Sequence, residues 1–343
     1  MNIDLLFYVA HLLLIYIYLI STLTFINSSW LTTIENSPYL LNRTNLVNRV
    51  FIFGIDGAGT LFNAEVPTIR NFMKTGIYTL NGTTVMPTIS AECWGSMFYS
   101  VYPESHALTN DIAENVKMSN PNITSLFNLT RKNFPDAEIY SYAAWKAFNV
   151  GMFENSVFNE TVAKIKDHKV FERGMNCIKN KNPKLLFLQL DDVDLSGHRY
   201  DYATPRYFMA LNQSSIRFSL FLEAIKEKNY LDESLIMIVS DHGGKLKDHG
   251  LGDEEIIRVF FAASGPGFPE NLEIFNYTVL DVAKIAAWSL GMAVPEDWVG
   301  NYPKELGNYF IQKQKQLVEK ERNDEINFKY GFSKPGSFFK FHL

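Results

Sequence analysis

An apolar run at residues 235–239 ends abruptly in Asp241 and His242, and a second imidazole, His249, follows after a short loop. The run is typical of a buried strand in a parallel sheet, and the glycines at 243–244 predict a turn at its end. Open α/β sheets bind their ligands just beyond the carboxyl ends of such strands. Carboxylate and imidazole groups are common zinc ligands, so this stretch predicts a metal-type site at a sheet edge.

Further apolar runs alternate with helical patterns along the chain. Strands are expected at residues 49–55, 79–86, 137–143, 185–190 and 257–264, and helices near 66–74, 91–99, 122–134, 160–180 and 204–228. This alternation predicts an α/β fold with a parallel, doubly wound sheet. With 343 residues, 47% of them hydrophobic, the chain can bury one large α/β core or two modest ones.

Two other predicted strands also end in possible metal ligands. Asp56 follows the run at 49–55, and Asp194 and His198 follow the run at 185–190. Each alone is more typical of a helix cap or a solvated histidine, but the carboxyl ends of parallel strands share one edge. These ligands are too many for one tetrahedral ion. Two ions about 3.5–4 Å apart would suit a phosphoryl displacement, in which they clamp the attacking and leaving oxygens.

Such a displacement needs a nucleophile, and Ser90 is the best candidate. It stands where a predicted strand gives way to a helix, near backbone N–H groups that favour a phosphate anion. A metal ion would lower the pKa of its hydroxyl and replace a general base. A plain helix N-cap is the alternative role for Ser90, and Thr88 is the rival hydroxyl, although Pro87 puts it in the approach to the turn.

Four motifs in this order resemble the alkaline phosphatase superfamily. They are IDG at Asp56, PTISAECWGSM around Ser90, DDVDLSGH ending at His198 and SDHGGKLKDHG ending at His249. The chain is most similar to the type I phosphodiesterase/nucleotide pyrophosphatase family and its compact, single-domain relatives, over about residues 49–303. The resemblance implies an alkaline-phosphatase-like three-layer α/β/α sandwich with a mostly parallel central sheet. Sulfatases share the fold, but Cys93 lacks their C/S-x-P-x-R pattern.

The resemblance also implies a site with two zinc ions, although Mn²⁺ can occupy similar ligands. One ion would be held by Asp56, Ser90, Asp241 and His242, and the other by Asp194, His198 and His249. The reaction implied is hydrolysis of a phosphodiester through a covalent phosphoserine on Ser90.

The chain departs from the family at two positions. Relatives commonly carry Thr where Ser90 stands and Asn where Cys93 stands, and a thiol is a poor hydrogen-bond donor. We expect Cys93, Trp94 and Lys146 to contact the substrate. Trp94, Trp145 and Tyr200 could stack on a base or an apolar group, although large aromatic side chains more often belong to the core.

Three hypotheses follow for the function. The first is a phosphodiesterase or pyrophosphatase acting on a small nucleotide or a lipid or sugar phosphodiester. The second is a phosphomonoesterase with the same site, which would call for an added Arg or Lys. The third is a non-catalytic binding protein, which would be expected to lose metal ligands that this chain keeps. A net charge of −5 and scattered basic residues argue against bulk nucleic acid as a partner.

The start of the chain predicts entry into the secretory pathway. Residues 5–25 are apolar and uncharged, which predicts a signal-anchor or signal peptide at 1–26. If it is not cleaved, this segment would hold the protein in a membrane. The catalytic domain, 49–303, would then face the lumen or the outside, between a polar stalk at 27–48 and a C-terminal extension at 304–343. Asn-X-Ser/Thr triplets fit this, and we expect glycosylation at Asn42, Asn81, Asn122, Asn128, Asn159, Asn212 and Asn276. Cys93 and Cys177 could form one bridge or stay as two thiols.

Overall fold

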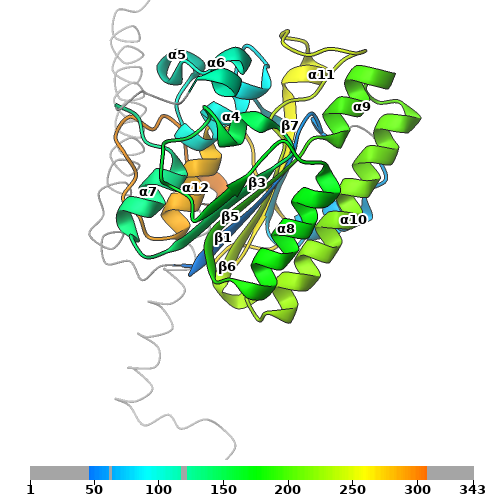
Figure 1. Cartoon of the computed structure of the whole chain (residues 1–343). Helices are drawn as coiled ribbons and strands as arrows, with labels where there is room; N and C mark the ends of the chain where they lie inside the picture. The colour runs from blue at the N-terminus through cyan, green and yellow to red at the C-terminus, as the bar shows by residue number, and fades with distance from the viewer. Residues whose placement is uncertain (1–45, 62–63, 117–121, 307–343) are drawn as a thin grey trace, which may run out of the picture. The chain divides into compact units, whose positions relative to one another are not determined.

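The computed structural model describes residues 46–61, 64–116 and 122–306. Their centre is an eight-stranded sheet with the order β4-β3-β5-β1-β6-β7-β2-β8 (Figure 1). The strands are β1 (Arg49–Ile55), β2 (Ile77–Thr83), β3 (Glu138–Ala143), β4 (Glu160–Val162), β5 (Pro183–Leu190), β6 (Ser234–Val239), β7 (Arg258–Ser264) and β8 (Leu272–Glu273). Of these eight strands, β7 alone runs against its neighbours, because its pairs with β6 and β2 are antiparallel. The mostly parallel sheet is therefore confirmed.

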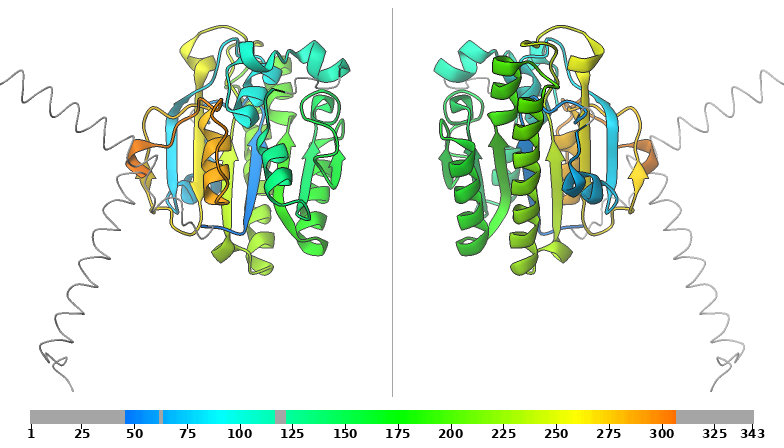
Figure 2. Two further views of the ribbon diagram at one scale, coloured as in Figure 1. Left: turned by 90° about the vertical axis from the view of Figure 1, so that its left-hand side faces the viewer. Right: turned by 90° about the vertical axis from the view of Figure 1, so that its right-hand side faces the viewer.

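Helices cover both faces of the sheet (Figures 1 and 2). One face packs against α3 (Pro67–Met73), α8 (Asp167–Asn180) and α10 (Pro205–Glu227), and the other against α4 (Ser90–Tyr99), α7 (Leu126–Asn133) and α12 (Asp281–Ser289). Shorter helices and turns lie in the connections: α5 (Pro103–His106), α6 (Asn110–Asn115), η1 (Lys146–Asn149), α9 (Asp192–Tyr200), η2 (Leu231–Glu233) and α11 (Glu254–Ile257). The described residues therefore form the predicted three-layer α/β/α arrangement.

The central strands read as continuous apolar runs because both of their faces are buried. In β1, Val50 and Ile52 join the core on the α4 side, whereas Phe51 and Phe53 join the core on the α10 side. All four side chains are fully buried. Such two-sided burial is the rule for parallel sheets whose crossover helices lie on both faces.

Three predicted elements differ from the structure, and one of them, the helix expected near 122–134, spans only Leu126–Asn133. The region 160–180 is not one helix, because residues 160–162 add β4 to the edge of the sheet beside β3 and α8 begins only at Asp167. The strand expected at 79–86 lies earlier, at Ile77–Thr83. In the region 160–180 an edge strand of three residues is too short to show a period of its own.

The two cysteines are free and buried. Cys93 belongs to the core on the α4 side of the sheet and Cys177 to the core on the α10 side, so no bridge joins them. Among the triplets within the described residues, Asn81, Asn159 and Asn212 are exposed, as are Asn122 and Asn276, and Asn128 is half-buried. Their glycosylation stays a prediction.

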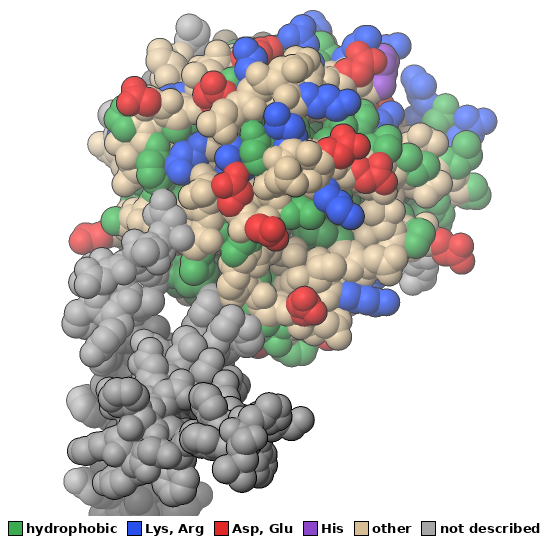
Figure 3. Space-filling view, turned by 90° about the horizontal axis from the view of Figure 1, so that it is seen from below, with side chains coloured by type: hydrophobic (Ala, Val, Ile, Leu, Met, Phe, Trp, Pro, Cys, Tyr) green, Lys and Arg blue, Asp and Glu red, His purple; other side chains and the backbone are tan. Residues whose placement is uncertain are grey.

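The predicted signal segment 1–26, Asn42 and most of the extension 304–343 lie outside the described residues. Within the described part of the chain, no helix is both long enough and apolar enough to cross a membrane. Figure 3 views the domain from the end of the sheet opposite α9 and α11. There, acidic and basic side chains are interspersed and form no large patch of one sign.

Candidate dinuclear metal centre

Three adjacent strands bring the predicted ligands together. Strands β5, β1 and β6 are neighbours and run parallel, so their carboxyl ends lie side by side. Asp56 directly follows β1, and Asp241 and His242 follow β6 after one serine. Helix α9, which begins just after β5, carries Asp194 and His198.

A first cluster surrounds the Nε2 atom of His242. This nitrogen lies 3.3 Å from Asp241 Oδ2 and 3.5 Å from Asp56 Oδ1. Ser90 Oγ lies 3.2 Å from the same nitrogen. The His242 Nδ1 atom donates to the carbonyl of Gly243 at 2.8 Å, which leaves the Nε2 lone pair directed at these oxygens. Asp56 Oδ1 and Asp241 Oδ2 are buried and have no hydrogen-bond partner among the described residues, and a bound cation would satisfy both.

A second cluster joins Asp194, His198 and His249. The Nε2 atom of His198 lies 3.2 Å from Asp194 Oδ2 and 3.2 Å from His249 Nε2. Each imidazole donates through Nδ1 to a backbone carbonyl, His198 to Lys247 at 2.7 Å and His249 to Thr88 at 2.6 Å. With both Nδ1 protons donated to carbonyls, the two Nε2 atoms and a carboxylate oxygen converge on one point, as ligands of a metal ion do.

The two clusters are contiguous. The rings of His242 and His249 stack with their centroids 3.9 Å apart. Asp194 lies where the two clusters meet, since its carboxylate can be grouped with His198 and His249 or with Asp56 and His242, and within each group the ligand atoms lie within 4.8 Å of one another. The donor set and its spacing fit two adjacent divalent cations.

The electrostatics of the site favour cations. Burial, reinforced by Asp194, raises the pKa of Asp56 to about 6, and burial together with Asp56 raises the pKa of Asp241 well above its usual range. Burial opposes ionisation of Asp194, but its hydrogen bond with His198 and the nearby imidazoles lower its pKa to about 2. The same hydrogen bond raises the pKa of His198 to about 9. Crowded buried carboxylates of this kind need positive charge to remain ionised together.

Ser90, rather than Thr88, presents its hydroxyl to the clusters. Ser90 is the first residue of α4, with its Oγ beside His242. Thr88 is fully buried, and its Oγ1 donates to the carbonyl of Leu251 at 3.0 Å and accepts from the N–H of Gly250 at 2.8 Å. Thr88 therefore holds the loop that carries His249.

The family model for type I phosphodiesterases and nucleotide pyrophosphatases matches residues 50–259, which is more than half of the 343 residues. The chain belongs to this family. Human ectonucleotide pyrophosphatase/phosphodiesterase family member 1 is 23% identical over 318 residues, which cover 81% of this chain and 32% of that protein. The chain thus spans about a third of the length of this relative.

Solved structures support the fold of this family member. Murine ectonucleotide pyrophosphatase/phosphodiesterase 5, solved as an inactive variant in complex with AMP, matches with a TM-score of 0.63 at 13% identity. The match covers 74% of this chain and 97% of that one. The lipoteichoic acid synthase LtaP of Listeria monocytogenes matches with a TM-score of 0.58 at 16% identity and covers 79% and 81% of the two chains.

Two predicted substrate contacts of this phosphodiesterase-family chain do not reach the surface. Cys93 is fully buried, with its Sγ 3.9 Å from the carbonyl oxygen of Pro87. Trp94 is also fully buried, and its Nε1 donates to Asp56 Oδ2 at 2.9 Å. Both side chains point into the core because α4 enters it directly after Ser90, and their contact with a substrate stays a prediction. The third predicted contact, Lys146, is half-exposed and forms an ion pair of 2.7 Å with Glu114.

Sequence reasoning missed Asn110, the first residue of α6. Its Oδ1 accepts a hydrogen bond of 3.0 Å from the N–H of Ala91, next to Ser90. The side chain is exposed, so its NH₂ group is available to a ligand. Nothing in the local sequence marks this asparagine, because the contact joins positions 19 residues apart.

Gln189 was also missed, although a signal existed. It is the polar residue in the otherwise apolar end of β5, and it is fully buried. Its Nε2 donates to Asp56 Oδ2 at 3.0 Å. A glutamine within such a run must find partners inside the protein, and here one partner is a candidate metal ligand.

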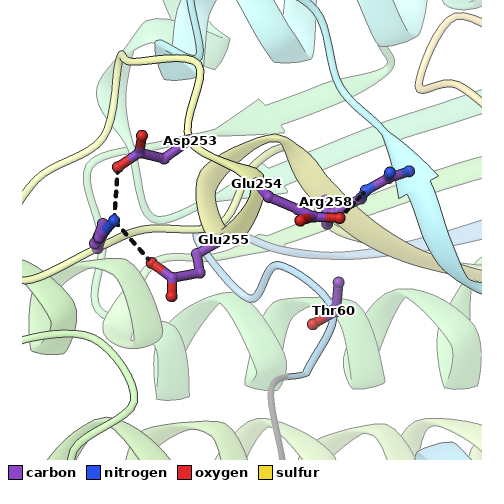
Figure 4. Close-up of a pocket in the computed structure, with 6 residues that line it drawn as sticks. Thr60, Asp253, Glu254, Glu255 and Arg258 are labelled. Carbon is purple, nitrogen blue, oxygen red and sulfur yellow. Dashed lines mark hydrogen bonds and ion pairs between the residues drawn. The ribbon is translucent and has the colours of Figure 1, made fainter.

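A cavity of about 390 Å³ opens beside the His249 loop (Figure 4). It is lined by Thr60, Lys245, Asp253, Glu254, Glu255 and Arg258, and none of the cluster residues lines it. Lys245 pairs with Asp253 at 2.9 Å and Glu255 at 3.5 Å, and Arg258 pairs with Glu254 at 3.4 Å. Its cations are thus balanced by carboxylates, and the cavity is separate from the metal centre.

Proposed function

We propose that this chain is a phosphodiesterase that depends on two zinc ions and uses Ser90 as its nucleophile. One observation carries the proposal: Ser90 Oγ and the two unpartnered carboxylate oxygens of Asp56 and Asp241 converge on His242 Nε2. A hydroxyl group that only capped a helix would not need to lie beside three residues of the kind that bind metal ions.

Asp56, Asp241, His242 and Ser90 would hold one ion, and Asp194, His198 and His249 the other. When bound, the ions lower the pKa of a coordinated hydroxyl or water and neutralise charge on the phosphoryl oxygens. The imidazoles are ready for this role, since each Nδ1 proton is already donated to a carbonyl.

The chemistry of the chain itself then runs in two displacements. Ser90 Oγ attacks phosphorus as it loses its proton, the bond from phosphorus to the leaving oxygen breaks, and that oxygen takes up one proton and departs as an alcohol. Water next attacks the phosphoserine, the bond from phosphorus to Ser90 Oγ breaks, and the monoester leaves as the hydroxyl is restored. Two in-line displacements retain the configuration at phosphorus.

Two lysines that lie close in sequence to the candidate loops are already paired, which favours a diester over a monoester. Lys146 pairs with Glu114, and Lys245 pairs with Asp253 and Glu255. Neither carries a free charge for the additional negative charge of a monoester, which usually recruits an added cation. A nucleotide diester or pyrophosphate is the substrate class we propose, in line with the AMP complex of the murine relative.

The test compares hydrolysis rates of bis-p-nitrophenyl phosphate and p-nitrophenyl phosphate by the zinc-loaded protein. We expect kcat/KM to be higher for the diester, because Lys146 and Lys245 are both paired and cannot neutralise the additional negative charge of the monoester. A higher value for the monoester would instead establish a phosphomonoesterase with the same site. No turnover of either ester by a protein that binds zinc would contradict the general phosphodiesterase proposal.

Asn110 is expected to support the phosphoryl oxygens. Replacing Asn110 by aspartate keeps an acceptor for the Ala91 N–H but removes the NH₂ donor, and we expect kcat to fall about 10²-fold. The matched control is Asn115→Ala on the same helix, because Asn115 donates only to Asp111. Full activity of Asn110→Asp, measured as kcat with the diester, would assign Asn110 to positioning of α4 alone.

We also infer entry into the secretory pathway, with the catalytic domain in the lumen or outside the cell. The apolar, uncharged segment 5–25 supports this, as do the exposed triplet asparagines Asn81, Asn159 and Asn212.

A further inference from the structure

The two carboxylate oxygens of Asp56 have different surroundings. Oδ1 has no hydrogen-bond partner and lies 3.5 Å from His242 Nε2, within the first cluster. Oδ2 accepts two hydrogen bonds, from Trp94 Nε1 at 2.9 Å and from Gln189 Nε2 at 3.0 Å. Both donors are fully buried. The carboxylate is therefore held by one oxygen while the other is left to bind a cation.

The amide of Gln189 is fixed in one orientation. Its Oε1 accepts from the backbone N–H groups of Ala144 and Trp145, each at 3.0 Å. A flipped amide would point its NH₂ group at these two donors, so the observed orientation is the one that satisfies all partners. Gln189 Nε2 must therefore face Asp56, and at 3.3 Å it also reaches Asp191.

The indole of Trp94 packs against β1 at a glycine. A Cβ atom at Gly54 would lie 2.6 Å from the Trp94 ring, so a glycine at this position makes room for the indole against the strand. Its ring also packs against Phe98 and Phe187 at centroid distances of 6.0 Å and 5.6 Å. The N–H is thereby brought to Asp56 by packing on three sides.

We infer that Trp94 and Gln189 are positioning residues for one metal ion, the ion held by Asp56, Asp241 and His242. By occupying Asp56 Oδ2, they restrict the carboxylate to binding through Oδ1 alone and set its direction. This inference rests on the proposed function, because it assumes that the clusters bind metal.

The second ion has its own, separate support. Tyr202 OH donates to Asp194 Oδ1, while Asp194 Oδ2 lies 3.2 Å from His198 Nε2. Each cluster thus has a carboxylate with one oxygen tied to a buried aromatic donor and the other directed at imidazole. A change at Trp94 or Gln189 should act mainly on the first ion and a change at Tyr202 mainly on the second, although Asp194 also lies within reach of the first cluster.

The experiment is a zinc competition titration of the full chain against a chromophoric chelator, which yields two dissociation constants. We expect Trp94→Phe and Gln189→Leu each to raise the same one of the two constants by about 10–100-fold, the usual effect of losing a partner of a metal ligand. Tyr202→Phe should raise the other constant. Trp94→Phe is the decisive variant, because it keeps an aromatic ring in the core and removes the N–H.

The matched control is Phe221→Leu on α10, a fully buried aromatic residue that packs against Phe51 and Phe53 on the other face of the sheet. It should leave both constants unchanged. The inference is overturned if Trp94→Phe and Gln189→Leu leave both constants at the wild-type values, or if they shift both constants together as general loosening would. Wild-type protein that binds no zinc would overturn the proposed function itself, and the inference with it.

Discussion

Replacing Ser90 by alanine is expected to abolish diester turnover, with kcat lower by on the order of 10⁴-fold or more, as for other enzymes that lose their nucleophile. Ser90 Oγ is the hydroxyl 3.2 Å from His242 Nε2, and alanine cannot form the phosphoserine. Zinc content should remain near two ions per chain, because carboxylates and imidazoles supply the other ligands. The measurements are kcat with bis-p-nitrophenyl phosphate and zinc content by elemental analysis.

The matched control is Ser96→Ala on the same helix. Ser96 is fully buried and its Oγ contacts His106 at 3.1 Å, away from both clusters, so this variant should retain most of the activity. Ser90→Thr should keep measurable turnover, since it preserves a hydroxyl. Activity of Ser90→Ala near the wild-type value, with zinc bound, would reject Ser90 as nucleophile.

Removing zinc is expected to lower the thermal midpoint of unfolding. The expected shift is about 10 °C for each ion, if the free zinc concentration had been a thousand times the dissociation constant of that ion. Chelation leaves the carboxylates of Asp56, Asp194 and Asp241 buried beside one another. Like charges without a counter-ion destabilise the folded state, and unfolding releases them into water. Calorimetry with and without chelator measures the shift.

The charge explanation has a test of its own in Asp241→Asn. The amide keeps an acceptor for the Gly57 N–H and removes a buried carboxyl group that, without a cation, must either take up a proton or hold an unpaired charge. In the presence of chelator this variant should be more stable than wild type by about 1 kcal/mol or more, whereas zinc should stabilise it less than wild type. Asp232→Asn, an exposed control, should change neither value. A chelated Asp241→Asn protein less stable than chelated wild type would contradict charge repulsion as the cause.

The sequence was enough to predict the central strands of the sheet and the set of candidate metal ligands. Apolar runs at 49–55, 185–190 and 235–239 became three adjacent parallel strands, because a strand buried on both faces needs apolar residues at every position. The carboxyl ends of parallel strands share an edge, so the sequence predicted that the candidate ligands lie close together. They are Asp56, Asp194, Asp241 and the imidazoles. That argument needs only the order of elements along the chain.

The tertiary structure alone decided how each ligand is held and which neighbours reach the site. Asn110 accepts a hydrogen bond from Ala91, and Trp94 and Gln189 both donate to Asp56. Cys93 lies in the core. Local sequence had instead suggested Cys93 and Trp94 as substrate contacts. The physical reason is that hydrophobic periodicity reports which face of an element is buried, but a hydrogen bond depends on the position and direction of single atoms. Trp94 and Gln189 reach Asp56 from 38 and 133 residues away, and only packing of α4 and β5 against β1 sets those directions.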